Sequence, residues 1–120
     1  MEIYKRFSFE AAHSLPNVGP DHQCARLHGH SYEVTVTVDG PVGDHSGWVM
    51  DFADLSTAMA PLLERLDHRN LNDVAGLENP TAERLAVWIW DHLAAGGLDG
   101  LAAVQVAETP RSGAIYRGPS

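Results

Sequence analysis

Residues 28–40, HGHSYEVTVTVDG, alternate apolar and polar side chains over most of their length. A period of two places alternate side chains on one face of a β-strand, and the turn residues Asp39-Gly40 end the pattern. The apolar positions are aromatic or β-branched, as strands prefer. The stretch therefore predicts a strand whose buried face carries Tyr32, Val34, Val36 and Val38.

The segment before this strand has the same period. Residues 3–11, IYKRFSFEA, predict a strand that ends near His13 and buries Ile3, Phe7, Phe9 and Ala11. The intervening residues 14–26, SLPNVGPDHQCAR, are rich in proline, glycine, asparagine and aspartate, and these residues favour a loop. We expect the two strands to pair antiparallel around it.

The period then changes to that of a helix. Residues 52–66 predict a helix in which Pro61 is a candidate kink, because proline lacks the backbone N–H. Its apolar positions are Phe52, Leu55, Met59, Leu62, Leu63 and Leu66. A second helix is predicted within residues 79–95, with Asn79 as N-cap and Pro80 as first helical residue.

Gly96-Gly97 ends this second helix, and residues 101–109 and 113–118 predict two further strands. The order β-β-α-α-β-β is typical of an α+β fold: a four-stranded antiparallel sheet with both helices on one face. A chain of 120 residues suits a single domain over residues 1–120. The exposed edges of so small a sheet favour oligomerisation.

The charge balance restricts the class of partner. Eight basic and sixteen acidic residues leave a net charge of −8, which disfavours binding to nucleic acid or to an anionic membrane surface. An anionic ligand would need local positive charge, for which Lys5, Arg6 and Arg26 are candidates. The single cysteine and the lack of a signal-like or membrane-spanning segment predict a cytoplasmic protein.

Three histidines form a candidate metal site. His28 and His30 point to the same side of their strand, about 7 Å apart. Antiparallel pairing would bring His13 alongside them. Three imidazoles with one open position are typical of catalytic zinc, although an H-x-H pair is also common on surfaces without a metal.

Cys24 has three possible roles. It could be a fourth ligand that closes the site, an inert buried thiol, or a base or nucleophile beside the metal. Arg26 could favour the thiolate in the last case. The residues alone leave these alternatives open.

Two further features could belong to the site. Asp67-His68 follows the first helix, and a carboxylate can set the tautomer of an adjacent imidazole, although a solvated helix end is the simpler explanation of the pair by itself. Glu108 ends an apolar strand, where it could bind a planar N–H edge of a ligand or simply face solvent.

Together these stretches resemble the 6-pyruvoyltetrahydropterin and 6-carboxytetrahydropterin synthase family over nearly the whole chain. The resemblance lies in FEAAH, CARLHGHS, GWVMDFADL, LDHRNLND, ENPTAERLAVWIW and AETPRSGAIYRG. It implies the tunnelling fold, in which protomers join edge to edge into a barrel, as a homo-oligomer such as a trimer or hexamer.

The resemblance also implies an activity. The spacing between Cys24 and the H-G-H pair resembles that of the 6-carboxytetrahydropterin synthases of queuosine biosynthesis. These enzymes are implied to be zinc lyases that convert 7,8-dihydroneopterin triphosphate to 6-carboxytetrahydropterin, acetaldehyde and triphosphate. The pyruvoyl reaction and a non-catalytic zinc- and pterin-binding protein are the alternatives. The implied roles are His13, His28 and His30 as Zn²⁺ ligands; Cys24 for proton transfer; Asp67 and His68 as a relay from a neighbouring subunit; Glu108 as catalytic group and pterin anchor; and Thr81 as pterin contact.

Overall fold

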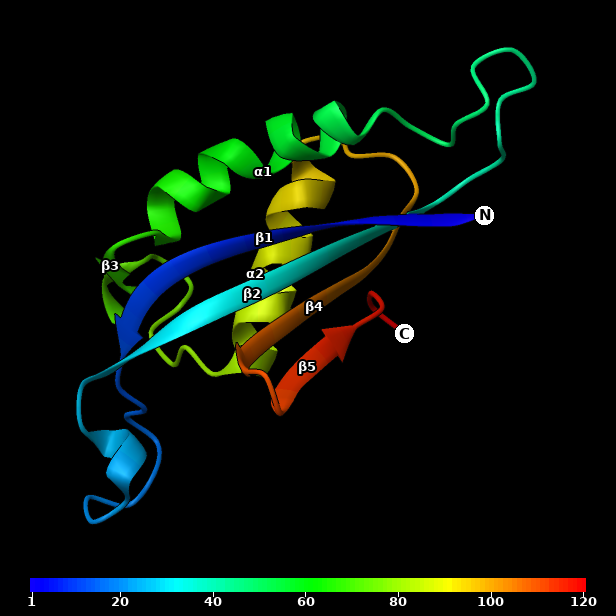
Figure 1. Ribbon diagram of the computed structural model, residues 1–120. Helices are drawn as coiled ribbons and strands as arrows, with labels where there is room; N and C mark the ends of the chain where they lie inside the picture. Colours follow the sequence, from blue (N-terminus) through cyan, green and yellow to red (C-terminus); the bar gives the residue numbers. More distant parts are fainter.

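The computed structural model describes residues 1–120 as one five-stranded sheet with two helices on one face (Figure 1). The elements are β1 (Glu2–His13), β2 (His28–Asp39), α1 (Phe52–Leu66), β3 (Arg69–Asn70), α2 (Ala82–Ala95), β4 (Leu101–Thr109) and β5 (Ser112–Tyr116). The strand order is β3-β1-β2-β4-β5, and β1, β2, β4 and β5 pair antiparallel. The predicted α+β architecture is confirmed.

The sheet has one strand more than the sequence predicts. β3 contains only two residues and pairs parallel with β1, Ala11 opposite Arg69 and Ala12 opposite Asn70. Two residues are too few to display an alternating pattern, so this strand has no signal in the sequence. It attaches the segment after α1 to the end of β1 that carries His13.

The helix boundaries follow the expected signals with one exception. α1 spans Phe52–Leu66 without a break at Pro61, and Gly97 adopts φ +88° just after α2. α2 begins later than predicted: its N-cap is Thr81 and not Asn79. The Thr81 hydroxyl accepts a hydrogen bond from the backbone N–H of Arg84 at 3.1 Å, which satisfies a donor of the first turn.

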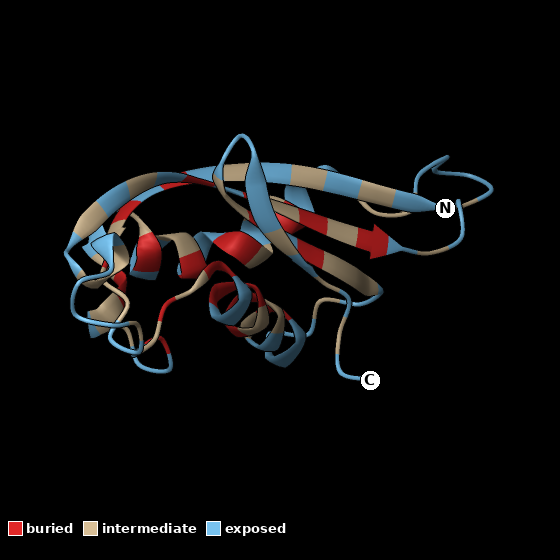
Figure 2. Cartoon of the chain, turned by 90° about the horizontal axis from the view of Figure 1, so that it is seen from below, coloured by how far each residue is buried: buried red, intermediate tan, exposed pale blue.

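The core lies between the sheet and the two helices, where Figure 2 shows the buried residues together. The predicted inward face of β2 is almost fully buried, and its neighbours on β1 and β4 continue the same layer. The opposite face of the sheet is mostly exposed (Figure 2). Neither helix combines the length and apolar character that crossing a bilayer requires.

Leu85 on α2 provides a test of this packing. Its side chain is fully buried, so a Leu85→Ala variant should lose about 2–5 kcal/mol of unfolding free energy, because a cavity adds to the lost transfer energy. Urea unfolding followed by circular dichroism measures the loss. Arg84→Ala, one residue earlier and exposed, is the matched control and should change the midpoint little. Equal effects of the two variants would contradict the assigned face of α2.

Candidate functional site

The candidate site lies at one end of the core-facing side of the sheet. The register of β1 and β2 places His13 opposite His28 and Ala11 opposite His30. His13 therefore continues the buried row of Phe9 and Ala11, and the two β2 histidines continue the row of Tyr32. The expected approach of His13 to the H-x-H pair is confirmed.

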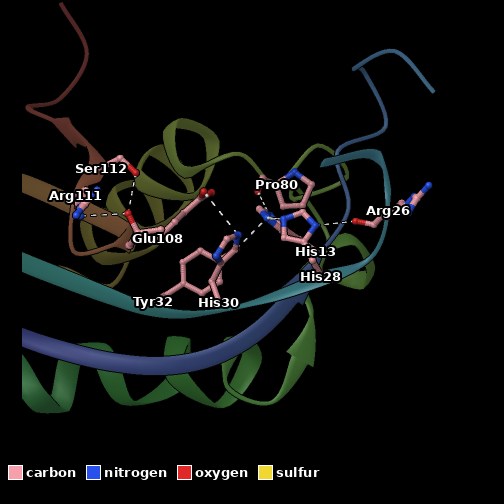
Figure 3. Close-up of polar contacts among 10 residues, drawn as sticks. His13, Arg26, His28, His30, Tyr32, Pro80, Glu108, Arg111 and Ser112 are labelled. Atoms are coloured by element: carbon pink, nitrogen blue, oxygen red, sulfur yellow. Dashed lines mark hydrogen bonds and ion pairs between the residues drawn. The ribbon is translucent and has the colours of Figure 1, made fainter. Parts of the chain in front are cut away.

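The three imidazoles converge on one point (Figure 3). One ring nitrogen from each of His13, His28 and His30 lies within 4.8 Å of the other two. His13 Nε2 and His28 Nε2 are 2.9 Å apart. Such a group of nitrogen donors could hold one metal ion.

Backbone carbonyls orient two of the rings. His13 Nδ1–H donates to Pro80 O at 2.8 Å, and His28 Nδ1–H donates to Arg26 O at 2.7 Å. Because a carbonyl only accepts, each ring presents its Nε2 lone pair to the cluster. Burial is the main cause that lowers the pKa of His13, so a neutral ring is favoured there.

These contacts fit a bound cation. Two neutral nitrogens that face each other at 2.9 Å repel unless a positive centre lies between them. His30 Nε2 is buried without any hydrogen-bond partner, which is costly for a polar atom. A metal ion bound by all three nitrogens would resolve both features, and the imidazole donor set suits zinc and neighbouring transition metals.

Cys24 and Glu108 line the same pocket of about 450 Å³ as the three histidines. The half-buried Cys24 is the middle residue of a 3₁₀ turn, Gln23–Ala25, and is not part of the group of possible metal ligands. Glu108 ends the inward row of β4, and its Oε2 lies 3.8 Å from His30 Nε2 (Figure 3). The pocket thus combines a group of possible metal ligands, a thiol and a carboxylate.

Thr81 lies in an adjoining pocket of about 390 Å³ that shares Glu108 and Leu15 with the first. Its hydroxyl oxygen already accepts the capping hydrogen bond of α2. The hydroxyl proton and the second lone pair stay available to a ligand. The structure therefore places Thr81 near Glu108, one pocket away from the histidines.

The structure places Asp67-His68 elsewhere. His68 lines a third pocket, of about 550 Å³, together with Glu10 and Ser31, whose side chains have the opposite parity to the histidines on their strands. The pair is therefore on the other side of the sheet from the pocket that contains Cys24. Neither Asp67 nor His68 lines the pocket that contains Cys24 in the same chain.

Asp67 and His68 form a defined pair in that position. His68 Nδ1–H donates to Asp67 Oδ1 at 3.0 Å, and the backbone N–H of Glu10 donates to the same oxygen at 3.0 Å. The Glu10 hydrogen bond is the largest cause that lowers the pKa of Asp67, with His68 contributing to the same shift. His68 is held in the left-handed region at φ +57°, which is uncommon for a non-glycine residue and costs backbone energy.

Of the three cations expected near the site, only Arg26 lines its pocket. Lys5 Nζ donates to Ser56 Oγ on α1, and Arg6 pairs with Glu33 at 3.7 Å on the other face. The prediction that Lys5 and Arg6 could supply positive charge near the histidines is therefore wrong. Both residues lie several positions before His13 on β1, and each strand residue adds more than 3 Å of separation.

Two contacts of the histidines lie outside the sequence motifs. Tyr32 places its hydroxyl 3.2 Å from His13 Nδ1, and Pro80 supplies the carbonyl that orients the same ring. Tyr32 is two positions after His30 and lies on the same face of β2, so the sequence could have indicated the first contact. Nothing in the sequence indicates the second, because Pro80 approaches only when α2 docks on the sheet.

Comparison with known proteins agrees with this arrangement. The family model described as 6-pyruvoyl tetrahydropterin synthase matches residues 2–119. The chain is 47% identical to the 6-carboxy-5,6,7,8-tetrahydropterin synthase of Synechocystis sp., covering 98% of this chain and 93% of that protein. It is 41% identical to the 6-pyruvoyl tetrahydrobiopterin synthase of Drosophila melanogaster, covering 98% and 79%.

The fold is similar to that of solved relatives. The structure of Caenorhabditis elegans 6-pyruvoyl tetrahydropterin synthase superposes with a TM-score of 0.91 at 30% identity, covering 99% of this chain and 96% of that one. The family model, the curated relatives and the solved structure all extend over almost the entire chain. The chain belongs to the 6-pyruvoyl tetrahydropterin synthase family.

Proposed function

We propose that this protein is a 6-carboxy-5,6,7,8-tetrahydropterin synthase, which converts 7,8-dihydroneopterin triphosphate to 6-carboxytetrahydropterin, acetaldehyde and triphosphate. The observation that carries the proposal is a single pocket lined by three converging histidines, Cys24 and Glu108. The higher identity to the Synechocystis carboxy synthase than to the Drosophila pyruvoyl synthase supports this member of the family. In the cytoplasm, the product would serve queuosine or another 7-deazapurine pathway.

Zinc is the metal that best suits the proposed site. His13, His28 and His30 would hold Zn²⁺ and leave a coordination position open. When bound, zinc supplies Lewis acidity to the hydroxyl groups of the substrate side chain. The carbonyls of Pro80 and Arg26 would keep two of the rings in the ligating tautomer.

The remaining side chains would bind the substrate and move protons. Glu108 can accept two hydrogen bonds from the amino-pyrimidinone edge of the pterin, and Thr81 can contact the same ring from the adjoining pocket. The thiol of Cys24 lies in the pocket wall, where it can exchange a proton with the substrate side chain. Asp67 fixes His68 with Nε2 free, ready to act as the complementary acid or base.

An active site with all these groups requires more than one chain. Since Asp67-His68 faces away from the pocket of its own chain, the pair would serve a neighbouring subunit of a homo-oligomer. Mixed assemblies of Cys24→Ala and His68→Ala chains should then regain activity that neither variant has alone. Co-expression with two different tags, followed by tandem purification and assay, measures this recovery.

The matched control mixes Cys24→Ala with Glu108→Ala. Both residues line the pocket of one chain, so no mixed site is complete and no recovery is expected. If the Cys24→Ala and His68→Ala chains assemble together but stay inactive, the placement of the pair in a neighbouring site is wrong.

The reaction itself is tested by product identification. Incubation of the zinc-loaded protein with 7,8-dihydroneopterin triphosphate should release acetaldehyde and give 6-carboxytetrahydropterin by mass spectrometry. Formation of 6-pyruvoyltetrahydropterin without carbon–carbon cleavage would assign the protein to the pyruvoyl branch. Zinc bound with no turnover would indicate a non-catalytic homologue.

A further inference from the structure

Glu108 and Arg26 lie on opposite sides of the three histidines. Figure 3 shows the carboxylate of Glu108 directed towards His30, and the side chain of Arg26 extending away from His28 on the other side. Both residues line the pocket that contains the histidines. The site therefore carries a negative charge at the Glu108 end and a positive charge at the Arg26 end.

The proposed substrate has a matching order. A neopterin phosphate carries the pterin ring at one end, the side-chain hydroxyls in the middle and the phosphate ester at the other end. If Glu108 binds the ring and the histidine cluster faces the hydroxyls, the phosphate chain extends towards Arg26. This inference rests on the proposed function.

The charges of the pockets favour the same direction. The adjoining pocket beyond Glu108 is lined by two carboxylates, Glu83 and Glu108, and by no lysine or arginine. Arg26 is the only lysine or arginine that lines the histidine pocket. In a protein with a net charge of −8, a polyanionic chain is repelled from the carboxylate end and attracted to the arginine end.

Arg26 is also free to bind an anion. Its side chain is exposed and makes no ion pair, whereas Arg6 and Arg65 contact Glu33 and Trp88 respectively. Its backbone is held in place, because its carbonyl accepts from His28 Nδ1–H and its N–H donates to Gln23 O at 3.2 Å. A guanidinium on a fixed backbone can bind phosphate oxygens with two parallel N–H donors.

We infer that Arg26 recognises the phosphate chain of the substrate and makes this site specific for phosphorylated pterins. The test compares the binding of neopterin triphosphate and neopterin, two fluorescent and fully oxidised analogues, to the zinc-loaded protein. The wild type should prefer the triphosphate. Arg26→Gln should weaken triphosphate binding by about 10- to 100-fold and leave neopterin binding unchanged, because only hydrogen bonds to charged oxygens are lost.

Arg111→Gln is the matched control. It removes the same charge from an exposed arginine in the turn between β4 and β5, on the Glu108 side of the histidines (Figure 3). It should keep the preference for triphosphate, and Arg26→Lys should restore part of it. Zinc content measured on each variant verifies that the histidine cluster is intact.

Three results would overturn the inference: no preference in the wild type, an unchanged preference in Arg26→Gln, or loss of the preference in Arg111→Gln instead. Failure of the proposed reaction has a different signature. Absence of acetaldehyde from dihydroneopterin triphosphate, with a phosphate preference that depends on Arg26, would contradict the proposed activity and support the assignment of Arg26.

Discussion

Replacement of Cys24 by alanine should reduce turnover of dihydroneopterin triphosphate by about 10²–10⁴-fold, the usual contribution of one proton-transfer group. The thiol lines the pocket of the three histidines without belonging to the group of possible metal ligands. Its removal should therefore leave the zinc content and the affinity for the pterin nearly unchanged. Rapid-quench assays of acetaldehyde release, together with zinc analysis, measure the two effects on one sample.

The control for this variant is Ala25→Ser, at the next position of the same 3₁₀ turn. It should have near wild-type activity, so that a large effect at Cys24 is attributable to the thiol. Loss of zinc from Cys24→Ala would mean that the sulfur is a ligand, and the division between metal-binding and proton-transferring residues would then be wrong.

Replacement of His30 by alanine should remove both the metal and the activity. A site with three protein ligands loses much of its affinity when one is deleted, and the remaining pair of imidazoles cannot orient an ion in the same way. His30 Nε2 makes no hydrogen bond within the protein, so the variant should still fold. We expect zinc content near zero by inductively coupled plasma mass spectrometry, and no acetaldehyde above background.

His45→Ala is the matched control, because His45 is an exposed histidine in the loop between β2 and α1. It should bind zinc and turn over substrate like the wild type. Full zinc occupancy in a folded His30→Ala protein would show that the ion binds elsewhere, and would contradict the three-histidine site.

The alternation of side chains between the two faces of each strand explains why so much of the site can be predicted from the sequence. Phe9, Ala11 and His13 differ by two positions, as do His28, His30 and Tyr32. A period of two assigns each set to one face, and a loop between two such strands favours antiparallel pairing. The approach of His13 to the H-x-H pair therefore follows from local patterns.

Other features depend on contacts between distant segments. The two-residue strand β3 forms only because Arg69 and Asn70 meet the end of β1. The hydrogen bonds between the backbone of Glu10 and the Asp67-His68 segment likewise fix these two residues on the face opposite to Cys24. Neither segment carries a periodic signal of its own, so neither location could be predicted.

The sequence by itself determined the α+β order, the inward faces of the strands and the three histidines, because repeating side-chain patterns follow directly from the geometry of strands and helices. Only the tertiary structure decided which carbonyls orient those histidines, that α2 begins at Thr81, and that Asp67-His68 lies on the opposite face. These features arise when segments far apart in the chain pack together, and packing depends on the shapes of both partners rather than on the pattern of either one.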